Sequence, residues 1–368
     1  MSPTAYLVFF ALVPTVLSVD WWKVVMGIGD VMADHYLDQD LRALRDHTLL
    51  QRWNQTLVRR FQSWSQGDMS DSLRMEEGLT TELQNITGDE TIKVWDFGTY
   101  ENATQQPVSR EFYNFSTFVD SFRKNREKYI NVTMLKGQVG YVSIRSMSDI
   151  VDIILPDPEM TEFFLGKMAA LNESKAVILD LRNNLGGDRE GVVHWASFFF
   201  NATPSVPLSD VYYRDGVNQY WTLLEVPGGI RFPDKPLYLL TSNRTRWEAE
   251  EFAYAMQVTN RTTIIGETTA GEEFTGMWIP IDGTDVHLLT RTNVVRNPIT
   301  QDSWSGKGVT PDITVPREEA LAEALRKIRG SEDTNMADSA GNTGPSRWTI
   351  YLVLISTGIV LLTSTTFM

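Results

Sequence analysis

The sequence contains no cysteine among its 368 residues. This absence excludes a thiol nucleophile, a thiolate zinc site, an iron–sulfur cluster and any disulfide scaffold. No phosphate-binding loop and no metal-ligand spacing occurs either, so we expect neither a cofactor nor a bound metal. Basic residues are also few relative to acidic ones, and the formal net charge is −14. Nucleic acid is therefore not an expected partner, because binding to its phosphates needs clustered Lys and Arg.

Apolar residues make up 42% of the chain, which is enough for a substantial core. The length favours roughly two domains, or one domain with a helical appendage. Composition shifts along the chain divide it into a signal peptide (1–18), a helical subdomain (19–95), a connecting segment (96–136), an α/β core (137–328), a flexible stalk (329–347) and a hydrophobic tail (348–368).

Both ends of the sequence indicate an extracellular, membrane-anchored protein. An apolar segment, Tyr6–Leu17, has the length of a signal peptide, and we expect cleavage after Ser18. Near the other end, the apolar segment Ile350–Leu362 has no basic residue after it and follows a polar spacer and the small residues 339–341. This order favours a glycosylphosphatidylinositol anchor attached at Ser339, with a retained transmembrane helix as the alternative.

The density of Asn-x-Ser/Thr sequons also favours an extracellular glycoprotein. Candidate glycosylation sites are Asn54, Asn85, Asn102, Asn114, Asn131, Asn172, Asn201, Asn243 and Asn260.

The segment Ala176–Gly187 organises the rest of the chain. It begins with a continuous apolar run, which predicts a buried strand, and ends with Gly186 and Gly187. Glycines at the carboxyl end of a strand let backbone amides approach a ligand or a developing negative charge. The alternative is a corner in which the two glycines only satisfy turn geometry.

The surrounding segments alternate between strand and helix. A period-two strand at 140–144 is followed by Asp157 and Pro158, an N-cap and a first-turn proline, and then by the strand at 176. The same order repeats with strands at 237–241 and 263–265 and a helix between them, and a terminal helix follows. The sequence therefore predicts an α/β fold built from βαβ units. Before this core, apolar residues at three- and four-residue steps predict amphipathic helices up to about residue 94.

Five segments together resemble the tail-specific (C-terminal processing) serine peptidase family, and most of all its interphotoreceptor retinoid-binding protein branch. They are Asp180–Gly187, Leu240–Ser242, Glu250–Ala253, Gly266–Gly271 and Trp304–Asp312. The resemblance covers about residues 21–328. It implies a crotonase/ClpP-like ββα core with an N-terminal helical subdomain. Members of this branch lack an inserted PDZ domain, which agrees with the short segment 91–136.

Active members of the family are similar in using a serine at the start of a helix, a lysine beyond the Gly-Glu-x-Thr segment and glycine amides as an oxyanion hole. Carried over to this sequence, the glycine pair Gly186 and Gly187 is intact, but the serine position falls on Trp247 and the lysine position on Glu272. A histidine found in relatives of this branch falls on Thr91. An indole has no nucleophilic oxygen, so the family's usual hydrolytic route is excluded.

Each of these residues also has a purely structural interpretation. In this interpretation Trp247 is a packing residue of the first helical turn, and Glu272 is a solvated loop carboxylate. Asp180 and Arg182 are interpreted as an ion pair at the end of the strand rather than as catalytic groups.

Three functions remain open at this level. The first is a non-catalytic protein whose cleft, lined by Trp247, Gly186 and Gly187, binds an apolar small molecule or an extended peptide. The resemblance implies a retinoid or a fatty acid. The second is an active serine-type peptidase that uses a displaced hydroxyl, Ser242 or Thr245. The third is a surface adhesion glycoprotein without a small ligand.

Overall fold

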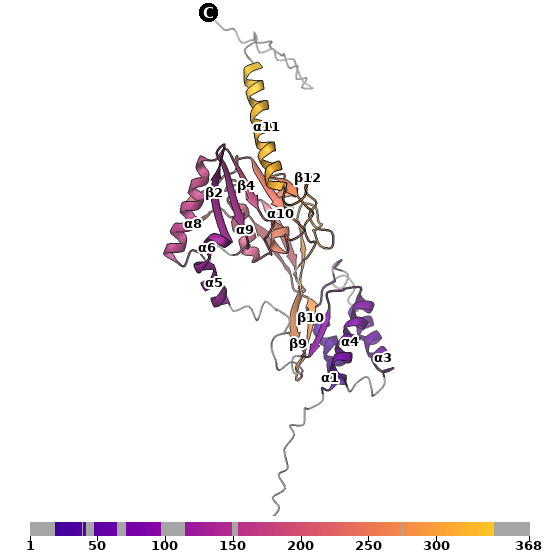
Figure 1. Ribbon diagram of the computed structural model, residues 1–368. Coiled ribbons are helices and arrows are strands. Elements are labelled where there is room, and N and C mark those ends of the chain that lie inside the picture. The colour runs from indigo at the N-terminus through magenta and orange to yellow at the C-terminus, as the bar shows by residue number, and fades with distance from the viewer. Residues whose placement is uncertain are drawn as a thin grey trace, which may run out of the picture. The chain divides into compact units, whose positions relative to one another are not determined.

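The computed structural model describes residues 19–38, 40–41, 48–64, 71–96, 115–148, 154–273 and 276–341. The chain divides into one compact unit of residues 1–321 and a second of residues 322–368. Figure 1 shows the helices and strands along the chain. The predicted α/β fold class is confirmed, because a mixed central sheet is combined with helices.

A six-stranded sheet with the order β12-β8-β7-β4-β3-β2 forms the core of the first unit. Neighbouring strands are parallel except β2, which runs antiparallel to β3. The strands are β2 (Ile130–Leu135), β3 (Val139–Ile144), β4 (Ala176–Asp180), β7 (Leu237–Thr241), β8 (Thr263–Gly266) and β12 (Ile313–Thr314).

The four strands predicted from the sequence are present as β3, β4, β7 and β8. Strand β2 lies in the segment expected to be a connection, so the sheet begins at Ile130 and not at residue 137. Its two buried residues, Ile130 and Val132, alternate with exposed ones. This is the pattern of an edge strand with one solvent-facing side, and it is too short to be recognised without its partner.

Three helices pack on one face of this sheet: α8 (Pro158–Ala170), α9 (Arg189–Ser197) and α10 (Glu248–Val258). Their apolar residues share a single core cluster with alternate residues of the strands, for example Val177, Leu239 and Ile264. Helix α8 begins as predicted, because the Asp157 side chain accepts hydrogen bonds from the amides of the first turn.

The N-terminal helices are α1 (Trp21–His35), α3 (Leu49–Phe61) and α4 (Ser72–Thr87). These helices do not form a core by themselves. Their core cluster includes Val286 and Leu288, which belong to a separate antiparallel sheet with the order β1-β10-β9, and Ile281, which lies between β9 and β10. Its strands are β1 (Lys93–Asp96), β9 (Gly276–Pro280) and β10 (Val286–Arg291). The helices therefore depend on a late segment of the chain.

The remaining elements connect or extend these parts. A small antiparallel sheet has the order β11-β5-β6. Its strands are β5 (Pro207–Tyr212), β6 (Val217–Trp221) and β11 (Val294–Arg296). The shorter helices are α5 (Phe115–Lys124), α6 (Arg126–Tyr129), η4 (Leu171–Glu173) and η5 (Pro227–Gly229), and α11 (Ala320–Gly341) is the last helix.

Helix α11 differs from the flexible stalk that was expected over 329–347. The helix continues to Gly341, so it includes the expected anchor residue Ser339. No proline occurs between Pro316 and Pro345, and the alanine, methionine and glutamate residues in this stretch favour helix despite its polar composition.

Several sequence-based predictions fall outside the described residues. These are the signal peptide (1–18), the hydrophobic tail (348–368), the sequons Asn102 and Asn114, and residues 97–114 of the segment in which a PDZ insertion was judged absent. Within the part of the chain that the structure describes, no helix is both long enough and apolar enough to span a bilayer.

The sequons that the structure describes fall into two groups. The side chain of Asn54 packs against α1: its Nδ2 lies 2.3 Å from where a Cβ on Gly29 would be, and its Oδ1 is buried. A glycan on Asn54 does not fit this packing, so that prediction conflicts with the fold. The others are exposed, namely Asn85, Asn131, Asn172, Asn201, Asn243 and Asn260.

Candidate functional site

The candidate site lies where β4 and β7 end, at the carboxyl edge of the parallel strands. Hydrogen bonds join the two loops that follow these strands. The Leu181 amide donates to the Leu240 carbonyl (2.9 Å), and the Arg246 amide donates to the Asn184 carbonyl (3.1 Å). Ligands bind at this edge in open α/β sheets, so the fold brings the residues singled out in the sequence to the place where a site is expected.

Trp247 stands at the N-cap of α10 and is the position at which the resemblance places the nucleophile. Its backbone has φ of 54° and ψ of −120°. A positive φ is rare for a bulky residue and costs about 1–3 kcal/mol. A sharp, strained turn from strand to helix is also how α/β hydrolases present a nucleophilic serine. The turn between β7 and α10 therefore has the backbone of a nucleophile elbow but carries an indole.

Glu250 holds this turn in place. Its buried carboxylate accepts hydrogen bonds from the Trp247 amide (3.0 Å), the Thr269 hydroxyl (2.5 Å), the Gly271 amide (2.6 Å) and the Glu272 amide (3.0 Å). Burial raises the pKa of Glu250 to about 7, and the four donors oppose that rise. One carboxylate thus ties the start of α10 to the loop after β8.

The glycine pair is intact, but both amides already have acceptors within the chain. The Gly187 amide donates to Oε2 of Glu248 (2.9 Å), and the Gly186 amide donates to Oδ1 of Asn184 (2.9 Å). Glu248 is only 6% exposed, and burial raises the pKa of its carboxyl. A carboxylate therefore occupies the place where an oxyanion would accept a hydrogen bond from Gly187.

The indole of Trp247 closes the space beside the glycine pair. A Cβ added to Gly186, whose φ is 94°, would lie 2.9 Å from the Cβ of Trp247 and 2.8 Å from Oε2 of Glu248. Both contacts are shorter than real Cβ atoms make, so Gly186 accommodates these two side chains only because it has none. The prediction that Trp247 faces the glycines agrees with this contact.

The two hydroxyls considered as displaced nucleophiles are fully buried. Ser242 donates its hydroxyl hydrogen to the Arg182 carbonyl (2.7 Å), and Thr245 donates to the Leu181 carbonyl (2.8 Å). Each hydroxyl oxygen also accepts a backbone amide hydrogen bond, from Arg244 and from Ser242 respectively. Both hydroxyls stabilise the loop between β7 and α10, and neither donates to a base.

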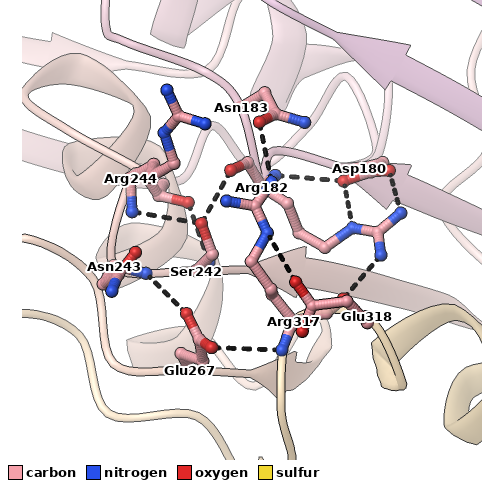
Figure 2. A network of polar contacts seen from close by, with 10 residues as sticks. Asp180, Arg182, Asn183, Ser242, Asn243, Arg244, Glu267, Arg317 and Glu318 are labelled. Carbon is pink, nitrogen blue, oxygen red and sulfur yellow. Dashed lines mark hydrogen bonds and ion pairs between the residues drawn. The ribbon is translucent and has the colours of Figure 1, made fainter.

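Asp180 and Arg182 form the ion pair expected from the sequence (Figure 2). Two nitrogens of the Arg182 guanidinium donate to the two Asp180 oxygens at 2.9 and 2.6 Å, and a third donates to the Arg317 carbonyl at 2.6 Å. Burial alone would raise the pKa of Asp180, but hydrogen bonds from Arg182 and Tyr141 outweigh it and hold that pKa below its usual value. The pair joins the end of β4 to the segment before α11.

Trp247 also lines a cavity of about 500 Å³. The three positions at which the family resemblance places a nucleophile, a lysine and a histidine, namely Trp247, Glu272 and Thr91, all line it. Gly186, Gly187, Ser242 and Thr245 do not. Glu272 is 41% exposed and forms an ion pair with Arg246 (3.0 Å), which agrees with its interpretation as a loop carboxylate.

Sequence reasoning missed the buried carboxylates of this region. Glu248, Glu250 and Glu251 all lie in the first turn of α10, and all are buried. Acidic residues are usual in a first helical turn because they complement the helix dipole, so they gave no sign of burial. Arg291, which is buried and pairs with Glu273 (3.3 Å) and Asp89 (3.6 Å), was also missed. Within the described residues, no group of His, Asp and Glu side chains has the arrangement of a metal site.

Residues 138–315 match the family model described as peptidase family S41. This part of the chain is an S41 domain. The predicted tail-specific protease family is thereby shown for this domain, whereas the retinoid-binding branch remains a resemblance.

Two solved structures have a similar fold at low sequence identity, and a third aligns with part of the chain. A protein described as a peptidase from Parabacteroides merdae is 15% identical, with a TM-score of 0.51 over 80% of this chain and 90% of its own. A lipoprotein from Streptococcus agalactiae is 14% identical, with a TM-score of 0.50 over 89% of this chain and 100% of its own. A photosystem II D1 C-terminal processing protease is 19% identical, with a TM-score of 0.41 over 52% of this chain. This chain covers about half (49%) of the length of that protease.

Proposed function

We propose that this protein is a non-hydrolytic S41-domain protein of the cell surface, in which the cleft beside Trp247 binds a ligand instead of cleaving it. One observation carries the proposal: the Gly187 amide donates to Glu248 while Trp247 occupies the elbow. Nucleophile and oxyanion site are thus both replaced by side chains of the same chain. Loss of such groups lowers hydrolytic rates by several orders of magnitude.

The alternative of a displaced nucleophile has little support from the geometry. A serine or threonine needs a neighbouring base to become nucleophilic. The hydrogens of Ser242 and Thr245 go to main-chain carbonyls, and both side chains have 0% exposure.

Purified protein is expected to show no labelling by a fluorophosphonate and no cleavage of a protein or peptide substrate, because the hydroxyls of Ser242 and Thr245 donate to main-chain carbonyls and not to a base. The measurement is gel fluorescence for labelling and mass spectrometry for cleavage, with an active serine peptidase as positive control. Labelling that disappears in Ser242→Ala or Thr245→Ala, with the fold retained by circular dichroism, would contradict the proposal.

The proposed ligand differs from the one that the resemblance implies. A retinoid or a fatty acid requires a mostly apolar lining. The lining of the cavity beside Trp247 is mainly polar and includes Asp89, Glu90 and Glu273. A fatty acid carboxylate would also be repelled by these side chains. The cleft is therefore proposed to bind a ligand that is neither a retinoid nor a fatty acid.

The cell-surface location rests on the two terminal segments and on the exposed sequons. Expressed with its own leader in a eukaryotic secretory cell, the protein is expected to lose apparent mass on treatment with a peptide N-glycosidase and to be released by a phosphatidylinositol-specific phospholipase C. Asn85→Gln should lower the apparent mass because Asn85 is exposed, whereas Asn54→Gln should not. Retention on the membrane after phospholipase treatment would indicate a transmembrane tail instead of the lipid anchor.

A further inference from the structure

The cavity beside Trp247 has the size of a ligand site. Its volume of about 500 Å³ lies within the range usual for small-molecule pockets. Residues from distant parts of the chain line it, including Tyr36, Thr91 and Ser305. The inference below rests on this cavity and on the proposed function, in which the cleft binds without cleaving.

The charge of the lining is strongly one-sided. Among the described residues that line the cavity, six carry a carboxylate and one, Arg291, is basic. The charge of Arg291 is already balanced by Asp89 and Glu273, which lie 3.6 and 3.3 Å from its guanidinium. The carboxylates belong to Asp38, Asp40, Asp89, Glu90, Glu272 and Glu273.

Three of these carboxylates are accessible to a ligand. Asp40 and Glu90 are exposed, and Glu272 is 41% exposed although it pairs with Arg246. Carboxylates that face a partly enclosed cavity strengthen each other's field, because the low-dielectric walls focus it. A positively charged group entering the cavity is therefore attracted, and an anion is repelled.

The indole of Trp247 adds a second kind of contact. Trp247 is partly exposed and lines the cavity, and the strained N-cap of α10 fixes its backbone. Indole is the best aromatic partner for an ammonium or guanidinium group placed over its face. A fixed indole beside carboxylates is the combination that recognises organic cations.

We propose that the cavity beside Trp247 binds an organic cation, an ammonium or guanidinium group carried on an aliphatic or peptide chain, with the cation between the indole and the carboxylates of Glu90 and Glu272.

The test is isothermal titration calorimetry of the full-length protein with agmatine, with a blocked tri-arginine peptide, and with a blocked tri-glutamate peptide and oleate as negative controls. Saturable binding of agmatine or of the tri-arginine peptide is expected. If agmatine binds more tightly, the natural ligand is a small amine, and if the peptide binds more tightly, the cation is carried on a peptide. Raising sodium chloride from about 20 mM to about 500 mM should weaken binding, because salt screens exposed charges.

Variants separate the proposed contacts from a general attraction to an acidic protein. The double variant Glu90→Gln/Glu272→Gln is expected to weaken binding about tenfold, and Trp247→Leu about fivefold. The control Glu77→Gln/Glu319→Gln removes two exposed carboxylates elsewhere and should leave the affinity unchanged. Thermal melts check that each variant is folded.

The outcomes distinguish this inference from the proposed function. No binding of either cation by folded protein, or equal weakening in the control double variant, would overturn the cation site. Mass spectrometry of the tri-arginine sample after titration reports on the function separately: a cleaved peptide would overturn the non-hydrolytic proposal even if the cation binds.

Discussion

Replacing Glu250 with alanine is expected to lower the free energy of unfolding by about 3 kcal/mol or more, because each buried donor left without an acceptor costs about 1–3 kcal/mol. The Glu250 carboxylate accepts three amide hydrogen bonds and one from the Thr269 hydroxyl. Removing the carboxylate also removes the burial penalty that raises its pKa to about 7, which offsets part of the loss. Urea denaturation followed by circular dichroism measures the difference.

The matched control is Glu77→Ala, which removes an exposed carboxylate from α4 and should change stability little. Glu250→Ala should also alter the emission spectrum of the folded protein if Trp247 moves when its turn is released. A stability equal to that of the control would show that the carboxylate does not hold the turn between β7 and α10.

Arg182→Met is expected to lower the free energy of unfolding by about 3–5 kcal/mol, because it leaves the buried carboxylate of Asp180 without its cation. The side chains of Asp180 and Arg182 are only 8% and 16% exposed. The pKa of Asp180 is lower in the folded state than in the unfolded state, so the ionised carboxylate stabilises the fold at pH values above its unfolded-state pKa. This stabilisation is lost as the pH falls through the folded-state pKa. The wild type should therefore lose stability below about pH 4, and the variant should lose less there.

Arg326→Met serves as the control, because Arg326 pairs with Glu323 at the surface, where it is 66% exposed. Exposed pairs contribute little to stability. If Arg182→Met and Arg326→Met have equal effects in denaturation experiments at neutral pH, the network in Figure 2 is not a stabilising one.

The parts of the fold that were predictable have local signals. The run from Ala176 to Asp180 is apolar at every position before the acid, as a strand buried on both faces must be. Asp157 and Pro158 mark the start of α8 within the sequence itself. Counting along the motifs put Trp247 at the start of a helix, and in the structure it is the N-cap of α10.

The parts that were missed depend on residues far apart in the sequence. Strand β1 pairs with β10, but the sequence of neither strand indicates that the other is its partner. Glu248 and Glu250 resemble ordinary first-turn acids until the loops carrying Gly187 and Gly271 are brought against them. The chemistry of the candidate site was therefore predictable only in part. The sequence shows that position 247 carries no hydroxyl, but only the packed structure shows that the Gly187 amide donates to Glu248.

The pairing of β1 with β10 also limits how the protein can be dissected. A recombinant fragment trimmed to the matched residues 138–315 would contain β9 and β10 but not β1 or the three N-terminal helices. The side chains of Ile281, Val286 and Leu288 would then face solvent, beside a strand edge without its neighbour. Such a fragment is expected to self-associate, so expression trials should keep residues 19–96 in the same polypeptide.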